Sequence, residues 1–134
     1  MSDVIKEIVV EQGKIALRAD GIIEIHSTDH FEYDVKHVLE NYDYIKKLKT
    51  TEKALILNVV GYNATMTKEV REYVAKGYHQ SFIKAEAFVI KSLAHKLLAS
   101  FYLKINKPIV PTGFFNSKVD AEKWLKILSI NLNF

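Results

Sequence analysis

The chain has 134 residues, of which 49% are hydrophobic and 26% are charged, and its formal net charge is +3. This composition is typical of one globular domain, which we expect over 1–134, and the absence of cysteine excludes disulfides, thiolate metal sites and a cysteine nucleophile. The sequence has no apolar run of about 18 residues and no secretory signal, so we expect a cytoplasmic protein without a transmembrane segment.

Alternating apolar residues predict an antiparallel start of the fold. Between residues 7 and 26, three short segments each place their apolar residues on one face, and the turn pairs Gln12-Gly13 and Asp20-Gly21 separate them. We therefore expect a meander of three strands, preceded by a loosely ordered end over residues 1–6.

A helix and a buried strand follow the meander. The capping residues Ser27, Thr28 and Asp29 predict the start of an amphipathic helix that runs to about Lys49. Residues 54–60 form a continuous apolar run, which predicts a central strand that is covered on both faces of a sheet. A polar turn then leads into a helix that begins near Met66 and ends at Gly77.

Strand and helix alternate through the rest of the chain. Residues 85–90 predict another buried strand, Ser92 caps a helix that ends near Asn106, residues 109–115 predict a short strand, and a terminal helix starts at Ser117. The expected inward residues of these two helices are Ala94, Leu97, Leu98, Phe101 and Ile105, and Trp124, Leu125 and Leu128. The fold class is therefore α/β, with a mixed sheet of about five or six strands, mostly parallel after the meander, and four helices.

The loop after the central strand is the first candidate site, because functional loops of open α/β sheets usually lie at the carboxyl ends of strands. Thr65 and Thr67 are both expected near a helix start, where a hydroxyl serves as an N-cap. A phosphate on either threonine would meet free helix N–H groups and add negative charge to a binding surface, which makes both possible phosphorylation sites. The candidate interaction loop comprises Asn63, Thr65, Met66, Thr67, Lys68 and Glu69.

Two adjacent aromatic pairs suggest a second kind of site. In Phe101-Tyr102 and Phe114-Phe115, one member of each pair must either turn away from the core stripe or line a cavity. These four residues therefore form a candidate apolar pocket for a small or lipid-like ligand, or a self-association patch.

Metal, catalytic and nucleic-acid sites are not expected. His30, Asp34 and His37 have helical spacing and ligand types that zinc accepts, yet no cysteine or Glu-x-x-His motif supports them. The chain has none of the common hydrolase, nucleotide-binding or metalloprotease motifs, so we assign no catalytic residue and no cofactor. The basic residues are interleaved with acidic ones, which gives no indication of a nucleic-acid surface.

Several stretches resemble the small bacterial proteins grouped as SpoIIAA-like or STAS/SEC14 domains. These stretches are the hairpin GKIALRADGIIEI, residues 67–73, and the tail from Lys107-Pro108 through Phe115 to residues 121–125. The resemblance implies a STAS fold and a regulatory loop after the central strand, in which a partner kinase modifies a serine or threonine, often within Asp-Ser-Ser-Gly. Met66 and Thr67 fall near the Asp-Ser positions, so this chain keeps only the hydroxyl of that motif.

These observations lead to three hypotheses of function. The first is a non-enzymatic cytoplasmic protein-interaction module with a regulatory role, which acts through the loop after the central strand on a partner that the sequence does not name. The alternative is a domain of SEC14-like type that binds a small apolar ligand or a lipid under the later helices. The third is an enzyme of unknown type, and a homodimer is compatible with each of them.

Overall fold

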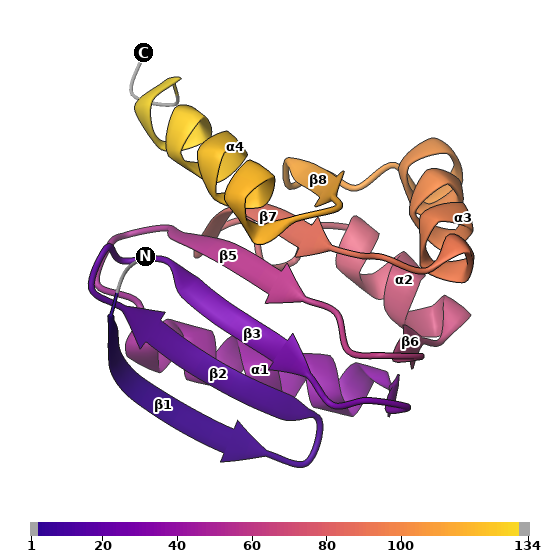
Figure 1. Ribbon diagram of the computed structural model, residues 1–134, viewed down its shortest axis with the longest axis horizontal. Helices are drawn as coiled ribbons and strands as arrows, with labels where there is room; N and C mark the ends of the chain where they lie inside the picture. The colour runs from indigo at the N-terminus through magenta and orange to yellow at the C-terminus, as the bar shows by residue number, and fades with distance from the viewer. Residues whose placement is uncertain (1–2, 132–134) are drawn as a thin grey trace.

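In the part of the chain that the structure describes, six strands form one mixed sheet in the order β1-β2-β3-β5-β7-β8 (Figure 1). The computed structural model describes residues 3–131. The first three strands pair antiparallel, and β5, β7 and β8 extend the sheet from β3 by parallel pairing. Their bounds are β1 Val4–Val10, β2 Gly13–Arg18, β3 Ile23–Ser27, β5 Ala54–Val59, β7 Ile83–Val89 and β8 Thr112–Phe115. The predicted α/β fold with an antiparallel meander is confirmed, and β5 is an interior strand as expected.

The first strand is longer than the sequence pattern predicts. Residues 4–6, which we expected to be loosely ordered, belong to β1, because Val4 and Lys6 pair with Arg18 and Leu17 of β2. Residues 1 and 2 of that expected loose end lie outside the described residues.

The first helix begins later than predicted. α1 spans Val35–Leu48, and the preceding segment forms β4 (Glu32–Tyr33), which pairs with β6 (Thr65–Met66) in a small parallel sheet. The capping types at 27–29 are used elsewhere: the Ser27 hydroxyl accepts a hydrogen bond from the Gly61 N–H at 2.7 Å, and Asp29 accepts one from the Tyr62 N–H at 2.8 Å. These residues therefore hold the loop after β5 instead of starting a helix.

Helices cover both faces of the sheet. Apolar residues of α1 and α2 (Lys68–Ala75) pack on one face, where the predicted one-sided residues of β1, β2 and β3 also gather. α4 (Lys118–Asn131) covers the other face through Ala121 and Leu125, with Trp124 and Leu128 beside them, so its inward side is as predicted. α3 (Leu93–Phe101) continues into a π-helical turn, η1 (Tyr102–Asn106), on the same side of the sheet as α2.

The inward side of α3 agrees with the prediction at Leu98 and differs from it at the other expected residues. His95, Leu98, Ala99 and Tyr102 turn toward the protein, whereas the expected inward residues Leu97 and Ile105 are 65% and 63% exposed. Phe101 and Ala94 are exposed as well. Because α3 is apolar on most of its circumference, the sequence pattern alone selects the wrong stripe.

Candidate functional site

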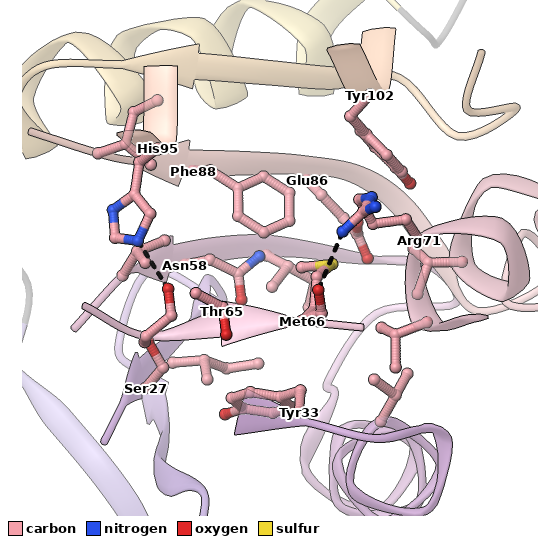
Figure 2. A pocket seen from close by; sticks show the side chains of 18 of the residues that line it. Ser27, Tyr33, Asn58, Thr65, Met66, Arg71, Glu86, Phe88, His95 and Tyr102 are labelled. Carbon is pink, nitrogen blue, oxygen red and sulfur yellow. Dashed lines mark hydrogen bonds between the residues drawn. The ribbon is translucent and has the colours of Figure 1, made fainter. Parts of the chain in front are cut away.

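A cavity of about 170 Å³ lies between the sheet and helices α1, α2 and α3. It is formed around the carboxyl-terminal halves of the parallel strands β3, β5 and β7, and the small β4–β6 sheet closes part of it (Figure 2). Exposed Thr65 is among the lining residues, so the cavity reaches the protein surface at β6. This position matches the place where open α/β sheets bind their ligands.

Most of the cavity wall is apolar. Phe88 of β7 and Phe114 of β8 stack with ring centroids 5.1 Å apart, which gives the wall an aromatic surface. Aliphatic side chains from the sheet and the three helices complete it: Ile25, Ile45, Ile56, Val70, Val74 and Leu98. A wall of this kind favours an apolar occupant over water.

A carboxyl group lies on the floor of this apolar cavity. Glu86 sits in the middle of β7 and only 6% of its surface is exposed. Burial raises the pKa of Glu86 from 4.5 to about 7, because the ionised carboxylate is poorly solvated there. Below neutral pH the side chain is therefore a neutral acid that can donate a hydrogen bond.

Behind Glu86 lies a buried histidine. His79 Nε2 is 3.4 Å from Glu86 Oε1 without a hydrogen bond between them, and His79 Nδ1 is 3.1 Å from the Tyr42 hydroxyl. Burial lowers the pKa of His79 to about 4, so its imidazole is neutral at pH 7. Tyr42 lines the cavity, whereas His79 does not.

Two buried donors in the cavity wall have no hydrogen-bond partner among residues 3–131. Arg71 of α2 donates from Nη1 to the Met66 carbonyl at 3.0 Å, and its Nε is buried and unpartnered. The Tyr102 hydroxyl is also buried and unpartnered, in a residue that is only 6% exposed. Buried donors are normally paired, so these two atoms mark the polar end of the cavity.

The structure separates the four residues of the predicted apolar pocket. Tyr102 and Phe114 line the cavity. Phe101 faces outward with Arg71 over its ring, and Phe115 packs against Trp124 on the α4 face at 5.5 Å between ring centroids. One member of each adjacent pair therefore lines the cavity, as the alternation along a strand and the turn of a helix require.

Residues of the predicted interaction loop contribute to the same cavity. Thr65 and Met66 form β6 and line it, and Thr67 caps α2 by accepting a hydrogen bond from the Val70 N–H at 3.2 Å. Asn63 adopts a left-handed conformation, with φ 56°, and its Nδ2 lies 3.3 Å from His30 Nδ1. Lys68 and Glu69 are exposed on the first turn of α2. Only Thr67 has the predicted capping role, since Thr65 belongs to a strand.

Sequence reasoning missed Glu86 and Arg71. Glu86 carries a signal that could have been used, because it is the one charged residue in the predicted buried strand 85–90. A carboxylate in such a strand must lie in the sheet interior on one face or the other. Arg71 has no comparable signal, since its position on α2 reads as part of the polar face.

The histidine and aspartate residues considered for zinc do not share a helix edge. His30 and Asp34 precede α1, and His37 Nδ1 accepts a hydrogen bond from the Asp34 N–H at 2.9 Å at the helix start. Among residues 3–131, no group of three histidine or carboxylate side chains is arranged to hold a metal ion.

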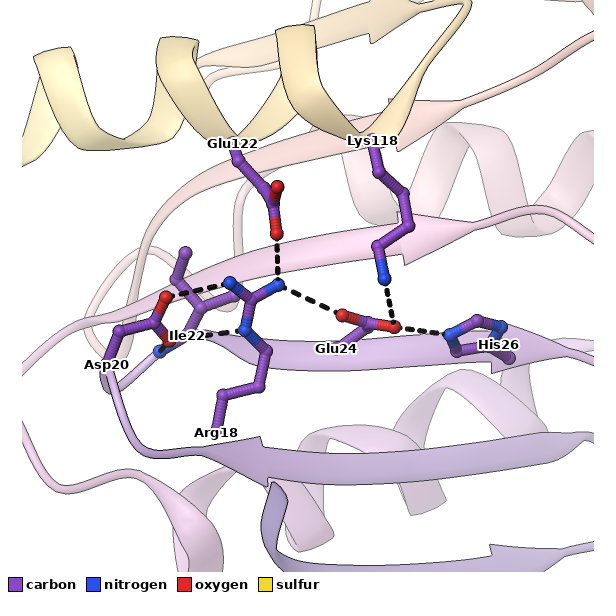
Figure 3. A network of polar contacts seen from close by, with 7 residues as sticks. All are labelled: Arg18, Asp20, Ile22, Glu24, His26, Lys118 and Glu122. Atoms are coloured by element: carbon purple, nitrogen blue, oxygen red, sulfur yellow. Dashed lines mark hydrogen bonds and ion pairs between the residues drawn. The ribbon is translucent and has the colours of Figure 1, made fainter. Parts of the chain in front are cut away.

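A second polar cluster lies on the opposite face of the sheet, under α4 (Figure 3). Arg18 of β2 is 3% exposed and pairs with three carboxylates, those of Asp20, Glu24 and Glu122. Glu24 also contacts His26 and Lys118, and its pKa falls to about 2, chiefly because of the hydrogen bond with His26. These side chains satisfy one another, so the cluster joins β2, β3 and α4 and leaves no open donor set for a ligand.

One family model, described as Domain of unknown function (DUF7793), matches residues 15–129. The chain belongs to the DUF7793 family. The DUF7793 region extends from β2 into α4 and contains every residue of the cavity, whereas β1 lies outside it. No curated protein and no solved structure matches the chain. None of the helices in the described region combines the length and apolar character that crossing a membrane requires.

Proposed function

We propose that this DUF7793 domain is a cytoplasmic binding domain that holds a small apolar molecule in the cavity between α1, α2, α3 and the sheet. The observation that carries the proposal is an apolar cavity of about 170 Å³ with two buried, unpartnered donors in its wall. Small-molecule binding sites in proteins combine apolar walls with a few polar groups in this way.

The proposal is for binding and not for catalysis. Glu86 and His79, which lie 3.4 Å apart, are not both accessible to a ligand, because His79 lies outside the cavity lining. The sequence-based resemblance to STAS/SEC14 domains is part of the proposal. An antiparallel meander followed by parallel strand–helix units supports it at the level of the fold.

Filling the cavity tests the proposal. Ala99 is buried on α3 and lines the cavity, so Ala99→Leu places three further carbon atoms in it. We expect wild type to bind toluene and hexanamide in an NMR titration of backbone amide shifts, and Ala99→Leu to bind both at least about tenfold more weakly. Ala94→Leu, on the exposed side of the same helix, is the matched control and should bind like wild type.

Two results would count against ligand binding. One is the absence of toluene and hexanamide binding to wild type, with no small molecule retained in native mass spectrometry of the purified protein. The other is equal binding by wild type and Ala99→Leu, which would place the bound molecule outside this cavity. If Ala99→Leu does not fold, Ala64→Val fills the β6 end of the cavity from another element.

A second candidate function, a protein-interaction surface on the loop from Asn63 to Glu69, has one observation in its favour. The loop joins the cavity to the surface, because Thr65 and Met66 line the cavity while neighbouring Tyr62, Lys68 and Glu69 are exposed. A bound molecule would thus contact the same segment that a partner would meet. Three points stay predictions: binding of a protein partner, phosphorylation of Thr65 or Thr67, and formation of a homodimer.

A further inference from the structure

We propose that the cavity selects a small apolar carboxylic acid, whose carboxylate is held by Arg71 Nε and Tyr102 Oη. This inference rests on the proposed ligand-binding function and names the chemical class of the ligand. Its basis is the position of the two unpartnered donors, the charge of Arg71 and the largely apolar character of the remaining wall.

The two donors lie at the same end of the cavity. In Figure 2 the Arg71 guanidinium and the Tyr102 hydroxyl are both drawn on the side of the cavity where Glu86 lies, and they come from α2 and η1 respectively. A buried donor without a partner lowers stability, and two such atoms in one wall would both be satisfied by a single acceptor group. A carboxylate has two oxygens that can accept from both donors at once.

The charge of Arg71 favours an anion over a neutral acceptor. Arginine side chains are cationic in proteins, and Arg71 has no carboxylate partner among the ion pairs of the described residues. Its Nη1 is held by the Met66 carbonyl and its central carbon lies 5.9 Å from the Phe101 ring centroid. The side chain is thus fixed in place, with Nε left for a ligand.

The other ionisable groups that face this space do not compete for an anion. Tyr42 bonds to His79, Tyr33 donates to the Gln12 carbonyl at 2.7 Å, and His95 Nε2 donates to the Ala64 carbonyl at 2.6 Å. Glu86 is the remaining one, and burial raises its pKa to about 7. A protonated Glu86 adds no negative charge and can donate a third hydrogen bond to the carboxylate.

The apolar wall and the volume set the rest of the ligand. A cavity of about 150 Å³ with apolar walls accommodates benzene, so about 170 Å³ fits a body of roughly six to ten non-hydrogen atoms. Hexanoate and phenylacetate have this size and one carboxylate each. A phosphate monoester would bring a second negative charge toward Glu86 in the same buried space, which this wall opposes.

The test compares each acid with its neutral amide of the same shape. Binding of hexanoate, hexanamide, phenylacetate and phenylacetamide to the full chain is measured by NMR titration at pH 6.5, where both acids are ionised. We expect each acid to bind about 10-fold to 100-fold more tightly than its amide, as for a hydrogen bond to a charged group. Arg71→Met should remove this difference while amide binding persists, and Tyr102→Phe should reduce it several-fold.

Lys96→Met is the matched control, since it removes one positive charge from an exposed position on α3 and should keep the preference for acids. Equal affinities of acids and amides in wild type, or an unchanged preference in Arg71→Met, would overturn the carboxylate inference and leave ligand binding intact. Failure of wild type to bind any of the four probes would instead overturn the ligand-binding function itself. If Arg71→Met does not fold, Tyr102→Phe decides the outcome, because it removes only the hydroxyl.

Discussion

At the scale of single residues, Glu86 links the cavity to the pH dependence of stability. The folded protein keeps the Glu86 proton up to a pKa of about 7, whereas an unfolded glutamate releases it near 4.5. The folded state therefore binds more protons in this window, and stability falls as the pH rises from about 4.5 to 7. His79, with a pKa of about 4, acts in the opposite direction, because its contribution to stability is lost as the pH falls from 6.5 to 4.

The Glu86→Gln variant separates the contribution of Glu86 to the pH dependence of stability from that of His79. Glutamine stays neutral, so the variant should gain stability relative to wild type as the pH rises, by on the order of 3 kcal/mol between pH 4.5 and 8. The measurement is the free energy of unfolding from urea titrations at several pH values, and the His79 effect cancels in the difference. Glu72→Gln, at an exposed position, should show no such trend. A difference between Glu86→Gln and wild type that stays constant with pH would contradict a protonated Glu86.

At the scale of elements, local capping signals predicted helix ends only where tertiary contacts left the capping residue free. Thr67 and Ser92 cap α2 and α3 as predicted, and Gly77 follows α2 in a left-handed conformation with φ 72°. Ser27 and Asp29 carry the same kind of signal, yet they bond to the loop after β5. The β4–β6 pairing could not be predicted, since two strands of two residues have no periodicity of their own.

Thr67 allows a test that separates a capping role from a regulatory one. Thr67→Ala removes the acceptor of the Val70 N–H bond and should lower the free energy of unfolding by about 1 kcal/mol, while Thr67→Ser keeps this acceptor.

Thr67→Glu tests the loop as a docking surface in affinity capture. A partner that binds wild type and Thr67→Ser but not Thr67→Glu would support a docking role of the loop. If all three proteins capture the same partners, Thr67 acts only as the N-cap of α2.

The candidate site could be predicted from the sequence only in part. The aromatic pairs indicated a cavity under the later helices, and Tyr102 and Phe114 do line one. The polar end could not be foreseen, because Arg71 reads as a surface residue and the inward side of α3 cannot be chosen in a helix that is apolar on most sides. Both depend on how α2 and α3 pack against the sheet, which a periodic pattern does not encode.

At the scale of the whole molecule, the Arg18 cluster ties the meander to α4. Glu122→Ala removes one of three carboxylates around a guanidinium that is 3% exposed, so we expect a loss of about 1–3 kcal/mol in the free energy of unfolding. Lys123→Ala, exposed on the same helix, should change stability by less than about 0.5 kcal/mol. Equal effects of the two variants in urea denaturation would show that Glu122 contributes no more than a surface charge.

The ion pair between Arg18 and Glu122 can form only late in synthesis on the ribosome. Arg18 and Glu122 are 104 residues apart in sequence, which at typical elongation rates corresponds to roughly 5–20 s. Throughout that interval the nascent chain holds Arg18 with only Asp20 and Glu24 as carboxylate partners from this cluster. The sheet face that α4 covers, including Leu57 and Ala87, stays uncovered until α4 has been translated. Chaperone contacts with the nascent chain should therefore include this face in the period before α4 is complete.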